Sequence, residues 1–272
     1  METFAPDSPL VQAVVPSPNR NARRGGEAGK PRAPDAIILH YTGLNPDAAE
    51  AWLADPGGAA LAWLCNPAAA VSCHYLIETD GKILQLVPEA ERAWHAGRGS
   101  WKGETDMNSA SIGIEIVNPG HDLGLPPFPA AQIAAVIALC KDIATRWPIA
   151  PERVLAHSDI APDRKADPGE NFPWDQLFKE GVGHWVAPAP GGEHCPVLKP
   201  GDCGEAVAKL RAELAAYGYG LPPGETYDML TGQTVRAFQR HFRPGKCDGI
   251  ADGQTRATLR ELARTLAPDR IS

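Results

Sequence analysis

Short apolar runs alternate with amphipathic stretches through the first two thirds of the chain. Ala36–Leu39 is a continuous apolar run, which is typical of a strand buried on both faces of a sheet. Residues 71–78 and 83–87 favour strands, and the Asp80-Gly81 step between them is a strong signal for a β-hairpin. Val154–Ala156 predicts another short strand. The pattern therefore predicts several strands that pair in one sheet.

One further strand has two chemically different faces. Isoleucine occupies every second position from Ile112 to Ile116, and Glu115 stands between two of these isoleucines. Successive side chains of a strand point to opposite faces, so the isoleucines enter the core while Glu115 points the other way. Glu115 is therefore expected on the solvent side of the sheet.

Helical patterns separate the strands. Residues 47–54 and 57–64 predict two short helices. From Pro129 to Trp147 the apolar residues recur at the spacing of one helix face, and Pro148 ends the pattern. Strands that alternate with helices predict an α/β fold, a mixed β-sheet flanked by helices.

The last third of the chain has a different pattern, with apolar stripes at helical spacing and no convincing strand. The stripes are formed by three sets of residues: Val207, Leu210 and Leu214; Val235, Phe238 and Phe242; Leu259, Leu262 and Leu266. We therefore predict a small C-terminal three-helix domain.

Proline and glycine mark the boundaries between these regions. Residues 1–34 are rich in proline and predict an extended N-terminal arm that packs on the domain after it. Residues 35–185 hold the α/β pattern, and residues 198–268 hold the helical one. Between them, residues 186–197 have the proline and glycine content of a semi-rigid linker.

Composition and charge exclude several classes of protein. The 272 residues are 43% hydrophobic and 22% charged, which suits a globular protein with a sizeable core. The formal net charge is -7 and no basic patch is evident, so we expect no nucleic-acid partner. No apolar run approaches the roughly 18 residues of a membrane span. The N-terminus also lacks the pattern of a signal peptide, which predicts a cytoplasmic protein, with the periplasm as the alternative.

The six cysteines are too few for a disulfide scaffold, and none form a CxxC pair. Cys195, Cys203 and Cys247 cluster in the last third of the chain. They could pair in an oxidising compartment, and the sequence leaves this open.

Two histidines stand at the ends of predicted strands. His40 directly follows Ala36–Leu39, and His157 directly follows Val154–Ala156. Asp167 lies beyond His157 in a proline-containing loop that can fold back on its own start. Two imidazoles and one carboxylate match the protein ligands of a catalytic zinc site, which leaves a fourth position for water. On spacing alone, two hydrogen-bonded histidines and a capping aspartate remain the simpler interpretation.

Five motifs change this balance, because they occur together in the order and approximate spacing of one enzyme family. They are Ile38–Thr42, Ser72–Ile77, Trp94–Gly97, Ser111–Asn118 and the loop from His157 to Gly169. With these motifs, residues 17–182 resemble the zinc-dependent N-acetylmuramoyl-L-alanine amidases of the type-2 amidase family, which are related to peptidoglycan recognition proteins. Residues 196–266 resemble the three-helix peptidoglycan-binding domain often appended to cell-wall hydrolases.

The resemblance implies a role for each candidate residue. His40, His157 and Asp167 match the zinc ligands of the family, so one Zn²⁺ per chain is expected. Glu115 matches the general base or acid, and Lys165 matches the cation that stabilises the tetrahedral oxyanion. The implied reaction is hydrolysis of the amide between the lactyl group of N-acetylmuramic acid and the L-alanine of the stem peptide, in peptidoglycan recycling or turnover.

The same motifs implicate four residues as substrate contacts: Tyr41, His74, His95 and Asn118. For His74, in a predicted strand, core packing is an equally good interpretation. His95 is expected at the cleft because the family places its motif beside the metal. Tyr41 stands where some relatives have asparagine, which affects substrate preference. The histidines without motif context are expected to be solvated: His121, His184, His194 and His241.

The implied partners are peptidoglycan or its muropeptide fragments, bound by a monomer. The residues do not decide between the ordinary and the 1,6-anhydro form of the sugar, nor between soluble muropeptides and intact sacculi. The alternative from another class is a non-catalytic peptidoglycan-recognition protein, which loss of a metal ligand would indicate. A cysteine peptidase built on Cys73 is a third hypothesis, and its activity would survive a chelator.

Overall fold

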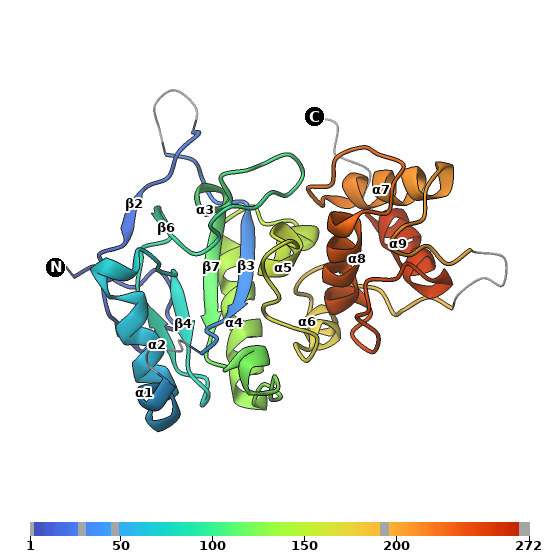
Figure 1. The fold of residues 1–272 in the computed structure, drawn as a ribbon. Coiled ribbons are helices and arrows are strands. Elements are labelled where there is room, and N and C mark those ends of the chain that lie inside the picture. The colour runs from blue at the N-terminus through green and yellow to red at the C-terminus, as the bar shows by residue number, and fades with distance from the viewer. Residues whose placement is uncertain (1–2, 27–30, 45–48, 191–195, 267–272) are drawn as a thin grey trace.

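The computed structural model describes residues 3–26, 31–44, 49–190 and 196–266. A mixed sheet of six strands forms the centre of the larger region (Figure 1). In spatial order the strands are β1 (Ala13–Val14), β5 (Ile83–Gln85), β4 (Tyr75–Ile77), β7 (Ser111–Ile116), β3 (Ala36–Tyr41) and β8 (Val154–Ala156). β3 runs parallel to both of its neighbours, whereas β4 and β5 pair antiparallel as the hairpin pattern predicts. The predicted mixed sheet is therefore confirmed.

Helices cover both faces of this sheet. The α-helices of this region are α1 (Ala49–Ala54), α2 (Pro56–Leu64), α3 (Met107–Ala110), α4 (Ala130–Arg146), α5 (His157–Ile160) and α6 (Trp174–Lys179). Short 3-10 helices lie at η3 (Pro67–Ala69), η4 (Gly120–Leu123) and η5 (Pro151–Arg153). On one face, the isoleucines of β7 pack against α4 and α6. On the other, α2 packs against Leu76 and Leu84.

The N-terminal arm is tied to the fold more closely than its composition predicts. β1 adds a parallel strand to the edge of the sheet beside β5. A second short strand, β2 (Arg20–Ala22), pairs antiparallel with β6 (Glu91–Ala93) in a separate two-stranded sheet. The buried guanidinium of Arg23 then donates hydrogen bonds to the carbonyl oxygens of Ser109 and Ser111, both at 2.9 Å. Strands of two or three residues are too short to show an alternating pattern, so the sequence could not predict them.

Three helices form the C-terminal region, as the apolar stripes predict: α7 (Glu205–Tyr217), α8 (Met229–Phe242) and α9 (Gly253–Thr265) (Figure 1). An aspartate caps each of the last two. Asp228 accepts a hydrogen bond from the backbone N–H of Thr231, and Asp252 accepts one from Thr255. The inward residues of the stripes are buried in one cluster.

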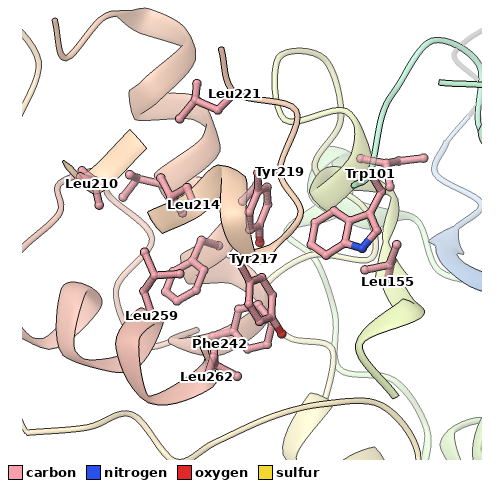
Figure 2. Packing of buried hydrophobic residues seen from close by; sticks show 14 of the residues in the cluster. Trp101, Leu155, Leu210, Leu214, Tyr217, Tyr219, Leu221, Phe242, Leu259 and Leu262 are labelled. Carbon is pink, nitrogen blue, oxygen red and sulfur yellow. The ribbon is translucent and has the colours of Figure 1, made fainter. Parts of the chain in front are cut away.

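The helical region and the α/β region share that hydrophobic cluster (Figure 2). Trp101 is fully buried, and its ring centroid lies 5.0 Å from that of Tyr219 and 5.9 Å from that of Tyr217. Gly218 has a φ of 150°, and a Cβ there would lie 2.4 Å from the Trp101 ring, so only glycine fits. Leu155 and Ile160 belong to the same cluster. The predicted linker, whose residues 191–195 lie outside the described ranges, thus connects two regions that pack together.

Removal of residues 190–272 should destabilise the remaining chain strongly. Each large apolar side chain that returns to water costs about 1.5–3 kcal/mol, and the truncation uncovers Trp101, Leu155 and Ile160. Several kcal/mol is a large part of the roughly 5–15 kcal/mol that stabilises a typical domain. We expect an insoluble or aggregating protein, measured by soluble expression and thermal unfolding. A soluble truncated chain with the melting temperature of the full chain would contradict a shared core.

Two further sequence expectations concern cysteines and membranes. Cys203 and Cys247 are free thiols, and Cys195 lies outside the described residues. A disulfide that involves Cys195 therefore stays a prediction. Within the described ranges, no helix has both the length and the apolar character needed to span a membrane.

Candidate metal centre and active site

Neighbouring strands deliver the two candidate histidine ligands to one edge of the sheet. His40 lies near the carboxyl end of β3, and His157 begins α5 directly after β8. β3 and β8 are parallel and adjacent, so their carboxyl ends meet. Asp167 joins them because its loop folds back: its carbonyl oxygen accepts a hydrogen bond from the backbone N–H of Ser158 at 3.1 Å.

The three candidate ligands converge with short separations. Nδ1 of His40 lies 2.9 Å from Nδ1 of His157 and 3.0 Å from Oδ2 of Asp167. Nδ1 of His157 lies 2.9 Å from the same Oδ2. All three side chains are buried, so one ion between these atoms would be shielded from solvent.

The hydrogen bond on the far side of the His157 ring and the environment of His40 both suit a metal ion in this cluster. Nε2 of His157 lies 3.0 Å from the carbonyl oxygen of Ala96, which can only accept, so this nitrogen carries the proton. With the proton on Nε2, Nδ1 of His157 is the ring nitrogen that can bind a metal ion beside the Asp167 carboxylate. Burial, followed by the nearby His157, lowers the pKa of His40 to about 4, so His40 is neutral at neutral pH. Facing lone pairs repel each other, and a cation between them removes that repulsion.

Glu115 stands beside the candidate metal-ligand cluster. On β7 it is the register partner of His40, and its Oε2 is buried without a hydrogen-bond partner among the described residues. Burial, followed by the negative charge of Asp167, raises the pKa of Glu115 well above its usual range. The alternating pattern correctly predicts that Glu115 points away from the isoleucines of β7. Its side chain lines a cleft, however, rather than facing open solvent. An unpartnered carboxyl group with a raised pKa is suited to proton transfer.

A cleft of about 410 Å³ opens over these groups. Its volume suits a small molecule or a peptide fragment. Part of the lining comes from α1 and α2, which contribute Trp52 and Trp63, two tryptophans that the sequence analysis did not single out. The lining includes His40, Tyr41, Trp52, Trp63, Trp94, His95, Glu115, His157, Arg164, Lys165 and Asp167.

Two neighbouring cations lie at the rim of the cleft. Lys165 is exposed and lines the cleft on the loop that ends in Asp167. Arg164 donates hydrogen bonds to the carbonyl oxygens of Ala96 and Arg98, and it also lies 3.4 Å from Nε2 of His157. Arg164 therefore holds the loop that binds His157. Its place beside Lys165 was the only signal for it in the sequence.

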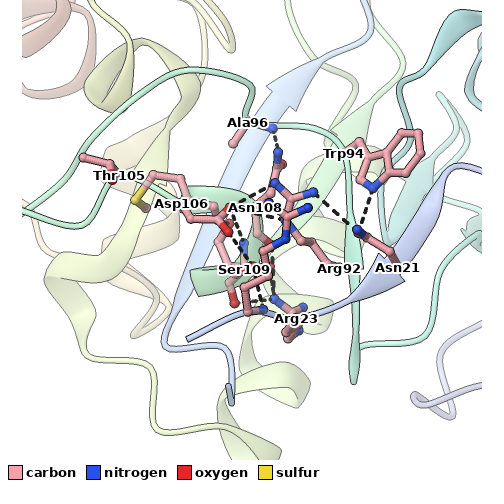
Figure 3. Close-up of polar contacts among 12 residues, drawn as sticks. Asn21, Arg23, Arg92, Trp94, Ala96, Thr105, Asp106, Asn108 and Ser109 are labelled. Carbon is pink, nitrogen blue, oxygen red and sulfur yellow. Dashed lines mark hydrogen bonds and ion pairs between the residues drawn. The ribbon is translucent and has the colours of Figure 1, made fainter. Parts of the chain in front are cut away.

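Residues 95–96 carry hydrogen-bond partners of both candidate histidine ligands. Nδ1 of His95 lies 3.0 Å from Nε2 of His40, and Ala96 binds His157 through its carbonyl oxygen. The side chain of Asn108 holds this pair of residues. Its Oδ1 accepts hydrogen bonds from the backbone N–H groups of His95 and Ala96, at 2.9 and 2.8 Å (Figure 3). Such outer contacts fix ring orientation in metal sites.

Comparison with known proteins places this chain in an enzyme family. Residues 30–170 match the family model described as N-acetylmuramoyl-L-alanine amidase. The chain belongs to this family. Residues 203–259 match a second model, described as a putative peptidoglycan binding domain.

Relatives of known name extend the match over nearly the whole chain. N-acetylmuramoyl-L-alanine amidase AmiD of Escherichia coli is 39% identical in an alignment of 268 positions, which covers 92% of this chain and 89% of the relative. A solved complex of that enzyme superposes with a TM-score of 0.67 at 36% identity, covering 91% of this chain and 95% of the other. The structure of AmpDh3 from Pseudomonas aeruginosa also gives 0.67, at 31% identity and coverages of 89% and 96%. The protein is an N-acetylmuramoyl-L-alanine amidase with the corresponding mixed-sheet fold.

Within this amidase, the four expected substrate contacts separate into two groups. Tyr41 and His95 line the cleft. The Tyr41 hydroxyl lies 3.0 Å from Nδ1 of His121, and burial, followed by Asp167, raises the pKa of Tyr41 to about 12. His74 and Asn118 do not line it.

Both residues that lie away from the cleft have their polar atoms engaged elsewhere. His74 is fully buried, and its Nδ1 accepts a hydrogen bond from the backbone N–H of Gly113 at 2.9 Å. Asn118 donates from Nδ2 to the carbonyl oxygen of Pro126 and accepts at Oδ1 from the N–H of Gly120. Their motif positions therefore serve packing and loop structure.

The histidines without motif context are not all solvated. His121 is partly exposed and lies 3.1 Å from Glu170, while His184 is half-buried and lies 2.8 Å from the Tyr217 hydroxyl. His241 contradicts the expectation, because it is buried and its Nδ1 lies 2.7 Å from Oδ2 of Asp159. The helix pattern alone could not reveal a partner so distant in the sequence. His194 lies outside the described residues.

The cysteine-peptidase hypothesis fails on the environment of Cys73. This residue is fully buried and does not line the cleft. Burial, followed by the charge of Glu115, raises the pKa of the Cys73 thiol well above its usual range. A buried neutral thiol away from the cleft is a poor nucleophile.

Proposed function

We propose that this amidase cleaves the bond between the lactyl group of anhydro-N-acetylmuramic acid and the L-alanine of the stem peptide. The observation that carries the proposal is the convergence of three buried ligand atoms and the unpartnered Glu115 carboxyl group in one cleft. Two relatives support the substrate class. The AmiD complex holds anhydro-N-acetylmuramic acid-L-Ala-D-gamma-Glu-L-Lys, and a second AmpDh3 structure holds an anhydromuramic pentapeptide.

The metal that we propose is zinc, held by His40, His157 and Asp167. Two imidazole nitrogens and one carboxylate oxygen form a donor set typical of catalytic zinc, with a position left for water or substrate. When bound, zinc in such a site supplies Lewis-acid polarisation of the carbonyl group and lowers the pKa of water.

The side chains of the cleft have separate roles in the reaction. Glu115 in its ionised form accepts a proton from the attacking water at its free Oε2 and then delivers it to the leaving L-alanine amine. The raised pKa of Glu115 favours this second, acidic step. Lys165, at the rim, places a positive charge beside the oxyanion that develops on the substrate. His95, Arg164 and Asn108 keep the histidine ligands in place.

The C-terminal region supports binding to larger wall fragments, because residues 203–259 match a peptidoglycan-binding model. A second site for the polymer raises the local enzyme concentration at the wall. We therefore propose that intact sacculi are also substrates.

Initial rates on matched substrates test the substrate proposal. The full chain is supplied with an anhydro-muropeptide tripeptide, with the corresponding ordinary muropeptide and with sacculi, and products are identified by mass spectrometry. We expect release of the intact tripeptide from the anhydro form, together with release of stem peptides from sacculi. Cleavage of the ordinary muropeptide with none of the anhydro form would overturn the proposed preference.

A further inference from the structure

Asp159 is a fully buried carboxylate two positions after His157, and it is not part of the cleft. It accepts hydrogen bonds from three groups. The backbone N–H of Ala156 and Nδ1 of His241 donate to Oδ2, at 2.8 and 2.7 Å, and the Tyr219 hydroxyl donates to Oδ1 at 2.8 Å. The first donor belongs to the turn that carries His157, and the other two belong to the C-terminal helical region.

The hydrogen bond from the Ala156 N–H to Asp159 fixes the backbone at the start of α5, where His157 lies. Ala156 is the last residue of β8, and His157 is the first residue of α5. A side chain that reaches back from the third helical position to this N–H fixes the first turn, as in a capping box. The adjacent Ser158 N–H binds the carbonyl oxygen of Asp167, so the same short turn also anchors the carboxylate ligand. A displaced Asp159 would therefore disturb two metal ligands.

The two C-terminal donors are held rigidly against the α/β region. The His241 ring stacks on Trp174 of α6, with ring centroids 3.7 Å apart and planes 23° apart. Tyr219 is buried with its ring edge against Trp101 (Figure 2). A buried carboxylate that loses its donors is left with a large desolvation penalty. Without Tyr219 and His241, the Asp159 carboxylate would have only the Ala156 N–H and would be driven to rotate toward other donors.

We propose that Tyr219 and His241 are positioning residues for the metal centre. Through Asp159 they hold the turn that begins at His157, so the C-terminal helical region completes the amidase site in addition to any part it has in wall binding. The inference rests on the proposed function only in taking His157 as a zinc ligand.

Two variants that each lack one tyrosine hydroxyl test this inference, and the second of them is the matched control. Tyr219→Phe removes the hydroxyl that binds Asp159. Tyr217→Phe removes a hydroxyl that is equally buried in the same interface but lies 2.8 Å from His184 instead. His241→Asn, which keeps a donor near the Nδ1 position, is compared with His241→Leu, which removes it. Each full-length variant is first checked for folding by thermal unfolding.

The first readout is zinc affinity, measured without substrate by competition with a chromophoric chelator. The second is the separation of kcat from KM on a soluble anhydro-muropeptide. Loss of a residue that hydrogen-bonds a metal ligand typically lowers metal affinity or activity by about 10–100-fold. We expect Tyr219→Phe to lower both zinc affinity and kcat by about 10-fold, the smaller end of that range, and to leave KM unchanged. Tyr217→Phe should match the wild type, and His241→Asn should retain more zinc affinity than His241→Leu.

Equal zinc affinity and kcat in Tyr219→Phe and Tyr217→Phe would overturn the inference, because the interface would then be purely structural. Since Tyr219→Phe removes one atom, it decides the question even if His241→Leu does not fold. Failure of the proposed function is distinguishable, because the wild type itself would then bind no zinc or leave muropeptides uncut.

Discussion

Replacing His157 with alanine should abolish tight metal binding and amidase activity together. His157 supplies one of the three candidate ligand atoms that the described residues bring together, and the other two would be left facing each other as an incomplete site. Loss of an outer-shell partner already costs about 10–100-fold in affinity or activity, so loss of a ligand should cost more than about 100-fold. Metal analysis after dialysis and rates on a soluble muropeptide measure the two effects.

His121→Ala is the control for this substitution. His121 is also an imidazole near the cleft, but it contacts Tyr41 and Glu170 rather than the ligand atoms. This variant should keep its zinc. Stoichiometric tight zinc in His157→Ala would show that the ligand assignment is wrong.

Glu115→Gln should keep the metal and lose most of the turnover. The amide has the shape of the carboxyl group but cannot accept and return a proton, and general acid–base groups typically contribute about 10²–10⁴-fold. Because Oε2 makes no hydrogen bond among the described residues, replacing the carboxyl group costs no hydrogen bond at that atom, and the fold should be retained. The rate of a single turnover at neutral pH, with zinc content measured on the same sample, gives the result. A rate near that of the wild type would remove Glu115 from the mechanism.

The positions of the two candidate ligand histidines were predictable because each follows an apolar run. Ala36–Leu39 and Val154–Ala156 read clearly as buried strands, and a residue at the end of a strand has a defined place in a parallel sheet. The side of the sheet to which Glu115 points was also predictable, because the alternating isoleucines show which face of β7 is in the core. Asp167 needed the family resemblance, because a loop has no periodicity that reports where it returns.

Contacts between distant parts of the chain were not predictable. His241 lies on a helix whose pattern marks only its apolar face, and its partner Asp159 is 82 positions away. His74 and Asn118 show a different limit, because a motif states that a residue matters without stating whether it faces a cleft or a core. The shared cluster around Trp101 likewise depends on packing between two regions. The hydrophobic pattern of each region predicts its own core and gives no sign of a contact with the other.

Metal-dependent cleavage at one defined bond is the most direct test of the central claim. The purified full chain is incubated with an anhydro-muropeptide before and after removal of metal by a chelator, and again after zinc is added back, with products identified by mass spectrometry. The structure predicts two products, the free anhydro sugar acid and the intact stem peptide with a new L-alanine amino terminus. Their formation should stop with the chelator and return with zinc. Cleavage within the stem peptide, or cleavage that continues in metal-free protein, would contradict the account.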